Sequence, residues 1–296
     1  GDHRDLHIEA HSFPTRRSSD LPTITAEAAV RLETVPYPDV GETLDVGAWE
    51  AKARDLLEEQ GRLLVWLNDP CHNPTGRSLS RDDRRTLLSM LRDIASQGPV
   101  TLLLDFAYLD YARNPEDVRE ALEDYAAFGA EQAVLVCASL SLSKAFTLYG
   151  SRAGALVFPW SDDPALKGAL VSSCRGTWSN CARAPMSVLL RMTRSETAQA
   201  ALAAEHAHWR RVLTERVAAL DAALKAEGLP GAPWDGGFFV TLPAPPDPFA
   251  VCETLKAADV FVVPMPEGLR VGVCGMKAAD TGRFAKAYAA SIASTT

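Results

Sequence analysis

Residues 62–76 decide the fold, and they read RLLVWLNDPCHNPTG. The first six residues are a short and mostly apolar run, which predicts a buried strand. Residues 68–76 are rich in turn-forming types, so the strand is expected to end in a polar loop. A helix is predicted next, because Ser80 with Asp83 three residues on resembles a capping box and Gly98-Pro99 ends the helical pattern.

The same order of strand, loop and helix continues along the chain. Further strands are predicted at residues 100–104, which end at Asp105, and at residues 133–138, which run into SLSLSK. Between them, Asn114-Pro115 opens a helix that Gly129 closes. Apolar strands that alternate with helices predict an α/β fold with a mainly parallel sheet covered on both faces. Ligands of such sheets bind at the carboxyl ends of the strands, and the polar clusters of this sequence follow those ends.

The pattern changes after residue 195. A long helix is predicted over residues 196–227, with Trp209, Leu213, Leu220 and Leu224 on one face. Strands are predicted at residues 236–242, 261–263 and 269–273. We therefore expect a large domain over residues 22–195, and a linking helix with a smaller α+β domain over residues 196–296.

Composition excludes several classes of protein. The 296 residues are 47% hydrophobic and 23% charged, and the net charge of −8 argues against a nucleic-acid or anionic-membrane partner. No apolar run approaches the length of a membrane span. The six scattered cysteines predict free thiols in a reducing compartment, and hence a cytoplasmic protein. No metal site is expected, because His206 and His208 lie two residues apart on a helix and face different sides.

Residues 1–21 differ from the rest of the chain. They hold three of the six histidines, and acidic residues interrupt any amphipathic pattern that a targeting helix would need. The segment resembles the conceptual translation of a sequencing-library adapter, so we expect it to be non-native. A disordered native tail is the alternative.

Four motifs then follow one another in a specific order. They are Asn73-Pro74-Thr75-Gly76, Asp105-Phe106-Ala107-Tyr108, Ser141-Leu142-Ser143-Lys144, and Arg152. Together they resemble the signature of fold-type-I aminotransferases that depend on pyridoxal 5'-phosphate, in the aspartate, tyrosine and aromatic subgroup. Later segments at residues 175–180, 236–239 and 269–272 match the same subgroup. The resemblance implies a homodimeric enzyme of amino acid metabolism and biosynthesis that exchanges an amino group between an amino acid and a 2-oxo acid.

The resemblance also implies roles for the residues that lie around the cofactor ring. Lys144 is the expected covalent attachment point, and its freed amine is expected to move the substrate proton. Such an amine must be neutral, so a lowered pKa is expected. Asp105 is expected to keep the pyridine nitrogen protonated, while Asn73 and Tyr108 are expected to contact the ring oxygen.

Further roles concern charged groups. Arg152 and Ser141 are expected to bind the cofactor phosphate with support from Ser143, because arginine suits bidentate contacts to phosphate. Arg270 and Asn73 are expected to bind the substrate, with Arg270 on its α-carboxylate. The alternative for Arg270 is a surface arginine on an edge strand.

Arg175 matches an arginine that reaches the distal carboxylate of the substrate across the dimer interface in some family members. Its presence keeps aspartate and glutamate open beside aromatic amino acids as substrates, and the sequence does not rank them.

The resemblance does not extend to every part of the family pattern. Members carry a further segment ahead of the matched part, with a phosphate-binding loop and an aromatic ring that stacks on the cofactor, and residues 22–72 contain neither. We therefore expect an N-terminally truncated chain that exposes apolar surface, dissolves poorly and has little activity.

Two alternative functions stay open. A lyase or decarboxylase on the same fold would use the same cofactor residues. An aminotransferase-like sensor domain of a transcription regulator would be distinguished by a DNA-binding segment further upstream.

Overall fold

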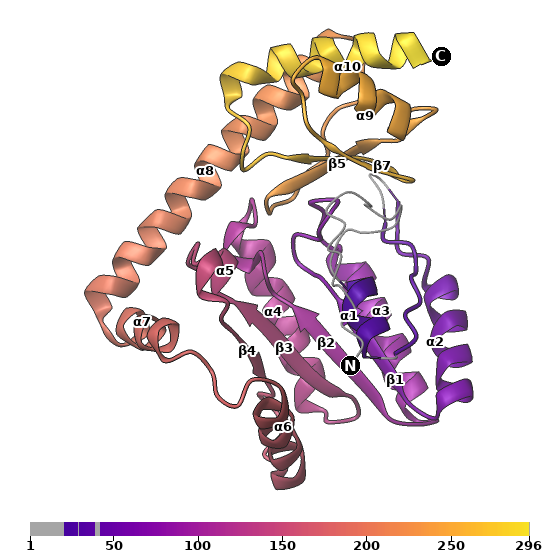
Figure 1. Ribbon diagram of the computed structural model, residues 1–296. Helices are drawn as coiled ribbons and strands as arrows, with labels where there is room; N and C mark the ends of the chain where they lie inside the picture. The colour runs from indigo at the N-terminus through magenta and orange to yellow at the C-terminus, as the bar shows by residue number, and fades with distance from the viewer. Residues whose placement is uncertain (1–20, 29, 39–41, 296) are drawn as a thin grey trace, which may run out of the picture.

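The computed structural model describes residues 21–28, 30–38 and 42–295. The predicted non-native segment therefore lies outside the described residues, except for Leu21. Two sheets organise the described part (Figure 1). The first has the order β1-β2-β3-β4, with β1 (Leu63–Leu67), β2 (Val100–Asp105), β3 (Leu135–Ser141) and β4 (Gly154–Val157). The second has the order β5-β7-β6, with β5 (Phe239–Pro243), β6 (Val263–Met265) and β7 (Gly268–Gly272).

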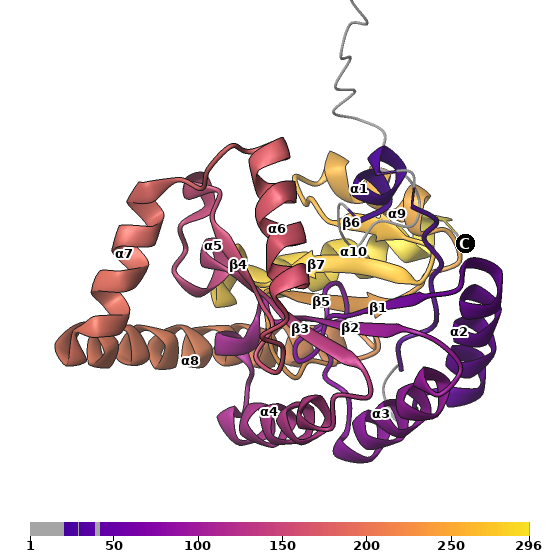
Figure 2. The ribbon, with the colours of Figure 1, turned by 90° about the horizontal axis from the view of Figure 1, so that it is seen from below.

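The α/β fold predicted from the sequence is confirmed. Strands β1, β2 and β3 run parallel, and β4 pairs with β3 in the antiparallel direction. Helices α2 (Val46–Gln60), α3 (Arg81–Ala95) and α4 (Pro115–Ala130) accompany the sheet on one side (Figure 2). Two of them begin at the predicted caps: the Ser80 side chain accepts a hydrogen bond from the Asp83 N–H, and the Asn114 side chain accepts one from the Glu116 N–H.

The two faces of the first sheet differ in burial. Leu63, Val65 and Leu67 are buried in one core cluster with the apolar sides of α2, α3 and α4. Leu64 and Trp66, which alternate with them, are 55% and 38% exposed. The prediction that both faces are covered is therefore only partly correct for the described residues. Leu103 and Cys137, which the register puts on the same side as Trp66, are buried, whereas Leu64 and Trp66 on the edge strand are not. We call this side the open face and define it by Leu64, Trp66, Asp105 and Leu156, which the strand register puts on one side.

Three helices surround the second sheet: α8 (Glu196–Ala226), α9 (Pro248–Ala257) and α10 (Thr281–Thr295). Leu213, Val217, Leu220 and Leu224 of α8 are buried in the core cluster that contains the strands β5 and β7. Trp209, which was predicted on the same face, is 42% exposed and lies before the part of α8 that enters this core.

The strand positions in this half are shifted from the prediction. β5 starts three residues late, after the Gly236-Gly237 turn, where Gly237 has a φ of 80°. β6 starts two residues late, and Phe261 is 75% exposed in the connection before it.

The remaining elements are short or peripheral. They are α1 (Leu21–Glu27), α5 (Leu142–Ala145), α6 (Pro164–Thr177), α7 (Arg183–Arg194) and the 3-10 turns η1 (Leu109–Tyr111), η2 (Tyr149–Ser151) and η3 (Ala278–Asp280). Among the helices that the structure describes, none combines the length and the apolar character that crossing a bilayer requires.

Candidate active site

The carboxyl ends of β1, β2 and β3 face the second sheet (Figure 1). The loop after β1, the turn after β2 and the short helix α5 after β3 all lie at this edge. Arg270 of β7 joins the two halves, because its Nη1 donates a hydrogen bond of 3.3 Å to Asn73 Oδ1. Arg270 therefore contacts the first predicted motif, and its charge acts on Tyr108 and Lys144 of the other two.

Lys144 lies in α5 among aromatic and charged groups. Its Nζ lies 4.4 Å from the ring centroid of Tyr149 and 5.7 Å from that of Tyr108. Burial is the main cause that lowers the pKa of Lys144, and the nearby charges of Arg152 and Arg270 lower it further, while Cys274 and Asp105 oppose the shift. The neutral, nucleophilic form of this amine is therefore populated at a lower pH than that of an exposed lysine.

Two side chains hold the backbone around Lys144. The Tyr111 hydroxyl donates to the Lys144 carbonyl at 3.0 Å, and His206 Nε2 donates to the Ala145 carbonyl at 2.7 Å. His206 Nδ1 lies 3.6 Å from an Asp110 carboxylate oxygen. Neither Tyr111 nor the role of His206 was predicted from the sequence, because η1 and α8 are both remote from α5 in the chain and only the fold brings them together.

Asp105 ends β2 and its carboxylate has two donors. Oδ1 accepts from the Ala107 N–H at 3.1 Å, and Oδ2 accepts from the Trp66 indole N–H at 3.3 Å. Burial raises the pKa of Asp105, and the contacts with Ala107, Trp66 and Lys144 oppose that rise. Trp66 was also missed, although the two-residue periodicity of a strand puts it on the same side of the sheet as Asp105.

Asn73 and Tyr108 border the same region. The Asn73 N–H donates to Asn68 Oδ1 at 2.7 Å, and the Asn68 amide donates to the Asp105 carbonyl at 2.9 Å. This chain of contacts, which includes the previously unrecognised Asn68, fixes the loop after β1 to the end of β2. Tyr108 is buried edge-on against Phe238 at a centroid distance of 5.3 Å, and its burial raises the pKa of its hydroxyl.

Arg270 lies on the central strand of its sheet, paired with Thr241 on one side and Val263 on the other. The alternative of a surface arginine on an edge strand is therefore wrong. Its guanidinium lies 4.6 Å from the ring centroid of Phe239, and burial lowers the pKa of the group.

The predicted phosphate-binding residues follow β3. Ser141 is the last residue of β3, and Ser143 is buried within α5. Arg152 adopts a left-handed conformation with φ of 47°, is exposed, and donates from Nη1 to the Tyr149 carbonyl at 3.1 Å. Its charge acts on the Lys144 amine, so Arg152 belongs to the same cluster.

Arg175 does not join this cluster in the described chain. It lies in the last turn of α6. This helix lies beyond the C-terminal end of β4, whereas α5 lies near the other end of that strand (Figure 1). Its neighbour Trp178 is 77% exposed.

His72 packs beside the Asn73 loop. Its ring stacks on Tyr37 at a centroid distance of 4.1 Å, and its Nδ1 lies 2.9 Å from Thr75 Oγ1. Burial lowers the pKa of His72 to about 4, so the ring is neutral at pH 7. Within the part of the chain that the structure describes, no three His, Cys, Asp or Glu side chains are grouped so that they could hold a metal ion.

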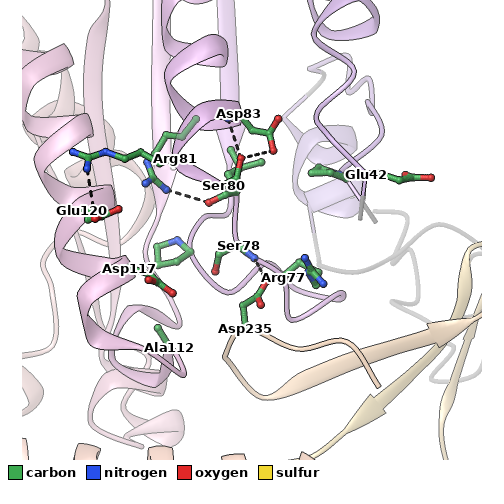
Figure 3. A pocket seen from close by; sticks show the side chains of 14 residues that line it. Glu42, Arg77, Ser78, Ser80, Arg81, Asp83, Ala112, Asp117, Glu120 and Asp235 are labelled. Atoms are coloured by element: carbon green, nitrogen blue, oxygen red, sulfur yellow. Dashed lines mark hydrogen bonds and ion pairs between the residues drawn. The ribbon is translucent and has the colours of Figure 1, made fainter. Parts of the chain in front are cut away.

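A separate pocket of about 350 Å³ lies between α3, α4 and the segment before β5 (Figure 3). Its charged side chains form ion pairs, with Arg77 Nε 2.9 Å from Asp235 Oδ2 and Arg81 Nη1 3.5 Å from Glu120 Oε1. Lys144 is not among the residues that line it. The pocket is therefore distinct from the cluster at the strand ends.

Comparison with known proteins identifies the family. The family model described as aminotransferase class I and II matches residues 22–287. An aromatic-amino-acid aminotransferase of Pseudomonas aeruginosa is 35% identical over 135 residues, which cover 46% of this chain and 31% of that protein.

Solved structures are also similar. The crystal structure of an aminotransferase from Anaerococcus prevotii has a TM-score of 0.83 at 24% identity, and the match covers 90% of this chain and 66% of that one. The Burkholderia pseudomallei aromatic-amino-acid aminotransferase, described as covalently bound to pyridoxal phosphate, has a TM-score of 0.62 at 24% identity, covering 77% of this chain and 56% of that one.

The matches span between 24% and 65% of the lengths of the curated relatives. The family model nevertheless covers most of the described residues, and the solved structures share the fold. The chain belongs to the class I and II aminotransferase family.

Proposed function

We propose that the protein transfers an amino group between an amino acid and a 2-oxo acid with pyridoxal 5'-phosphate as its cofactor. The observation that carries the proposal is the position of the Lys144 amine, which lies 4.4 Å from the ring centroid of Tyr149 and 5.7 Å from that of Tyr108 and whose pKa is lowered by burial. A lowered pKa increases the fraction of the neutral amine, which is the form that attacks an aldehyde, relative to an exposed lysine at the same pH.

The side chains of the cluster fit the chemistry of this cofactor. A carboxyl group, an amine with a lowered pKa and an arginine suit a pyridine nitrogen, an aldehyde and a phosphate, and the cluster holds Asp105, Lys144 and Arg152. When bound, the cofactor supplies an aldehyde that accepts the amino group and a ring that withdraws electrons.

Lys144 is the proposed covalent attachment point, and its amine then carries the proton of the substrate Cα. Asp105 holds a proton on the pyridine nitrogen, and its hydrogen bonds from Ala107 and Trp66 favour the ionised carboxylate that this role needs. Tyr108 and Asn73 donate to the ring oxygen.

The anionic groups are assigned to the remaining residues. Arg152 and Ser141 bind the phosphate, and Ser143 supports them from within α5. Arg270, oriented by Asn73 and Phe239, binds the α-carboxylate of the substrate.

The proposed substrates are aromatic amino acids and aspartate or glutamate. The names of the relatives support this range, since they include aromatic-amino-acid, aspartate and tyrosine aminotransferases. Arg175 lies outside the Lys144 cluster of its own chain, so we propose that it serves the active site of a partner in a homodimer. A cytoplasmic location stays a prediction that rests on the six free thiols.

The test is chemical labelling of the holoprotein. After incubation with pyridoxal 5'-phosphate and reduction with borohydride, we expect the label on the peptide that contains Lys144, and no label in Lys144→Ala. A label on another lysine would contradict the proposal. Amino transfer that requires a 2-oxo acid acceptor would separate a transaminase from a lyase on the same fold.

A further inference from the structure

Two thiols lie in contact at the surface of the protein. Cys174 belongs to the last turn of α6, and Cys181 follows the end of that helix by four residues. Their Sγ atoms are 3.9 Å apart. Cys181 is exposed and Cys174 is partly exposed, whereas Cys71, Cys137 and Cys252 are buried.

We propose that Cys174 and Cys181 form a reversible disulfide and so make up a redox modification site. An S–S bond is about 2 Å long, so the sulfurs must approach by roughly 2 Å. The connection from Trp178 to Ala182 lies between α6 and α7, outside any helix or strand, and is exposed. An exposed connection can make this movement without disturbing the buried core clusters.

The reaction balances with a small disulfide such as glutathione disulfide as the oxidant. The Cys181 thiolate attacks one of its sulfurs, that S–S bond breaks, and one glutathione thiolate leaves. Cys174 then loses its proton and attacks the Cys181 sulfur, which releases the second glutathione thiolate. Two protein thiols are oxidised and one disulfide is reduced.

The order of attack follows from exposure and hydrogen bonding. Cys181 is the more exposed of the two thiols. The hydrogen bond with Cys181 is the main cause that raises the pKa of Cys174, so this thiol is a poorer initial nucleophile than it would be without that contact.

The ring closed by this bond contains Arg175 and Trp178. Oxidation would therefore restrict the movement of the segment that carries Arg175. This is the arginine that we assign to the distal group of the substrate. This consequence rests on the proposed function, while the disulfide itself does not.

The site is tested by peptide mapping of the full chain after incubation with glutathione disulfide. We expect a Cys174–Cys181 cross-link that a reducing agent reverses, and in Cys174→Ser a stable glutathione adduct on Cys181. Cys274 is an internal control, because it is exposed and has no thiol within hydrogen-bond distance among the described residues. It should form only the glutathione adduct. Adducts on Cys174 and Cys181 without a cross-link would overturn the proposal.

Two residues this close in sequence also meet in an unfolded chain, so a second measurement isolates the contribution of the fold. The equilibrium between the glutathione adduct and the cross-link gives the effective concentration of the second thiol. We expect it to be at least about tenfold higher in the native protein than in concentrated urea. Equal values would show that the folded structure does not pair these thiols.

The functional consequence is measured separately on the holoprotein. Oxidation should change the ratio of KM for aspartate to KM for phenylalanine by about threefold or more, and should leave it unchanged in the double variant C174S/C181S. If the cross-link forms and the KM ratio does not change, the effect on substrate selection is refuted and the modification site stands. Absence of the cross-link would refute the modification site whether or not the protein is a transaminase.

Discussion

Trp66 contacts the acidic residue of the candidate site from the neighbouring strand. Its indole N–H donates to Asp105 Oδ2, and this contact favours the ionised carboxylate. Trp66 is thus a positioning residue that acts through Asp105.

We predict that Trp66→Phe raises the pKa of Asp105 and weakens binding of pyridoxal 5'-phosphate about tenfold, since a hydrogen bond to a charged group contributes about 1.5 kcal/mol. Carboxyl NMR titration and cofactor titration measure the two effects. Trp66→His keeps an N–H donor and should restore part of both, whereas Trp209→Phe, at another partly exposed tryptophan, should change neither. An unchanged Asp105 pKa in Trp66→Phe would remove Trp66 from this role.

His72 gives the stability of the protein a defined pH dependence. Burial lowers its pKa in the folded state to about 4 from the ordinary value of 6.5, so the unfolded chain binds more protons between these two pH values. The free energy of unfolding must therefore fall as the pH drops from 6.5 towards 4, by up to about 3 kcal/mol from this group.

Replacement of the ring tests this prediction. His72→Phe keeps an aromatic ring against Tyr37 and removes the titration, so its unfolding free energy should fall less across this pH window. Urea unfolding at several pH values measures the difference. Parallel pH profiles for the two proteins would be the contrary result.

At this scale, the sequence could propose candidate site residues that lie within local motifs, and their roles stay predictions. Asn73, Asp105, Tyr108, Lys144 and Arg152 stand in or just after loops that follow predicted strands, and the fold gathers them with Arg270. It missed Trp66, Asn68, Tyr111 and His206, since each is recognisable only by a contact with a distant segment.

Helices α3 and α4 are joined by a cluster of charges around Asp124. Arg84, whose side chain is 4% exposed, lies 3.2 Å from the Asp124 carboxylate, and Arg85 lies 3.1 Å from it. Loss of the Asp124 charge would leave the buried Arg84 with only the more distant Asp69 carboxylate, at 3.8 Å, and breaking a buried ion pair is strongly destabilising.

We predict that Asp124→Asn lowers the free energy of unfolding by about 3 kcal/mol, as measured by urea denaturation. Glu120→Gln is the matched control on the same helix. Its ion pair with Arg81 is partly exposed, so its effect should stay within about 1 kcal/mol. Equal effects of the two substitutions would show that the burial of Arg84 does not matter here.

Elements with strong local signals were predicted well, and the others were not. Caps at Ser80 and Asn114 fixed the starts of α3 and α4. Strand β4 was not predicted, because its four residues are too few to give a clear pattern, and its antiparallel direction depends on pairing with β3. The shift of β6 has a similar origin, since its register is set by β7.

The whole molecule carries an uncovered apolar surface. On the open face, Leu64 and Leu156 are 55% and 49% exposed. Apolar surface of this kind binds hydrophobic dyes and promotes association. The poor solubility expected of this chain stays a prediction, and this surface is its physical reason.

We predict that the 296-residue chain binds anilinonaphthalene sulfonate and self-associates in sedimentation velocity. Leu64→Gln should reduce both effects, whereas Phe261→Gln, at a more exposed residue away from this face, should leave them largely unchanged. A monomer that binds no dye would contradict the prediction.

We also propose the division into residues 22–195 and 196–296 as two domains. It is supported by the two separate sheets and by two core clusters. The division is not complete, because the core cluster that contains β5 and β7 also includes Tyr108 and Tyr111, which belong to residues 22–195.

Helix α8 has a mechanical consequence for this arrangement. It runs for 31 residues, or about 46 Å. The side chains of its later turns are packed in the core cluster with β5 and β7. In an earlier turn, His206 donates a hydrogen bond to the Ala145 carbonyl, next to Lys144. The helix therefore connects the second sheet rigidly to the backbone beside Lys144, so a rotation of that sheet would change the orientation of α5.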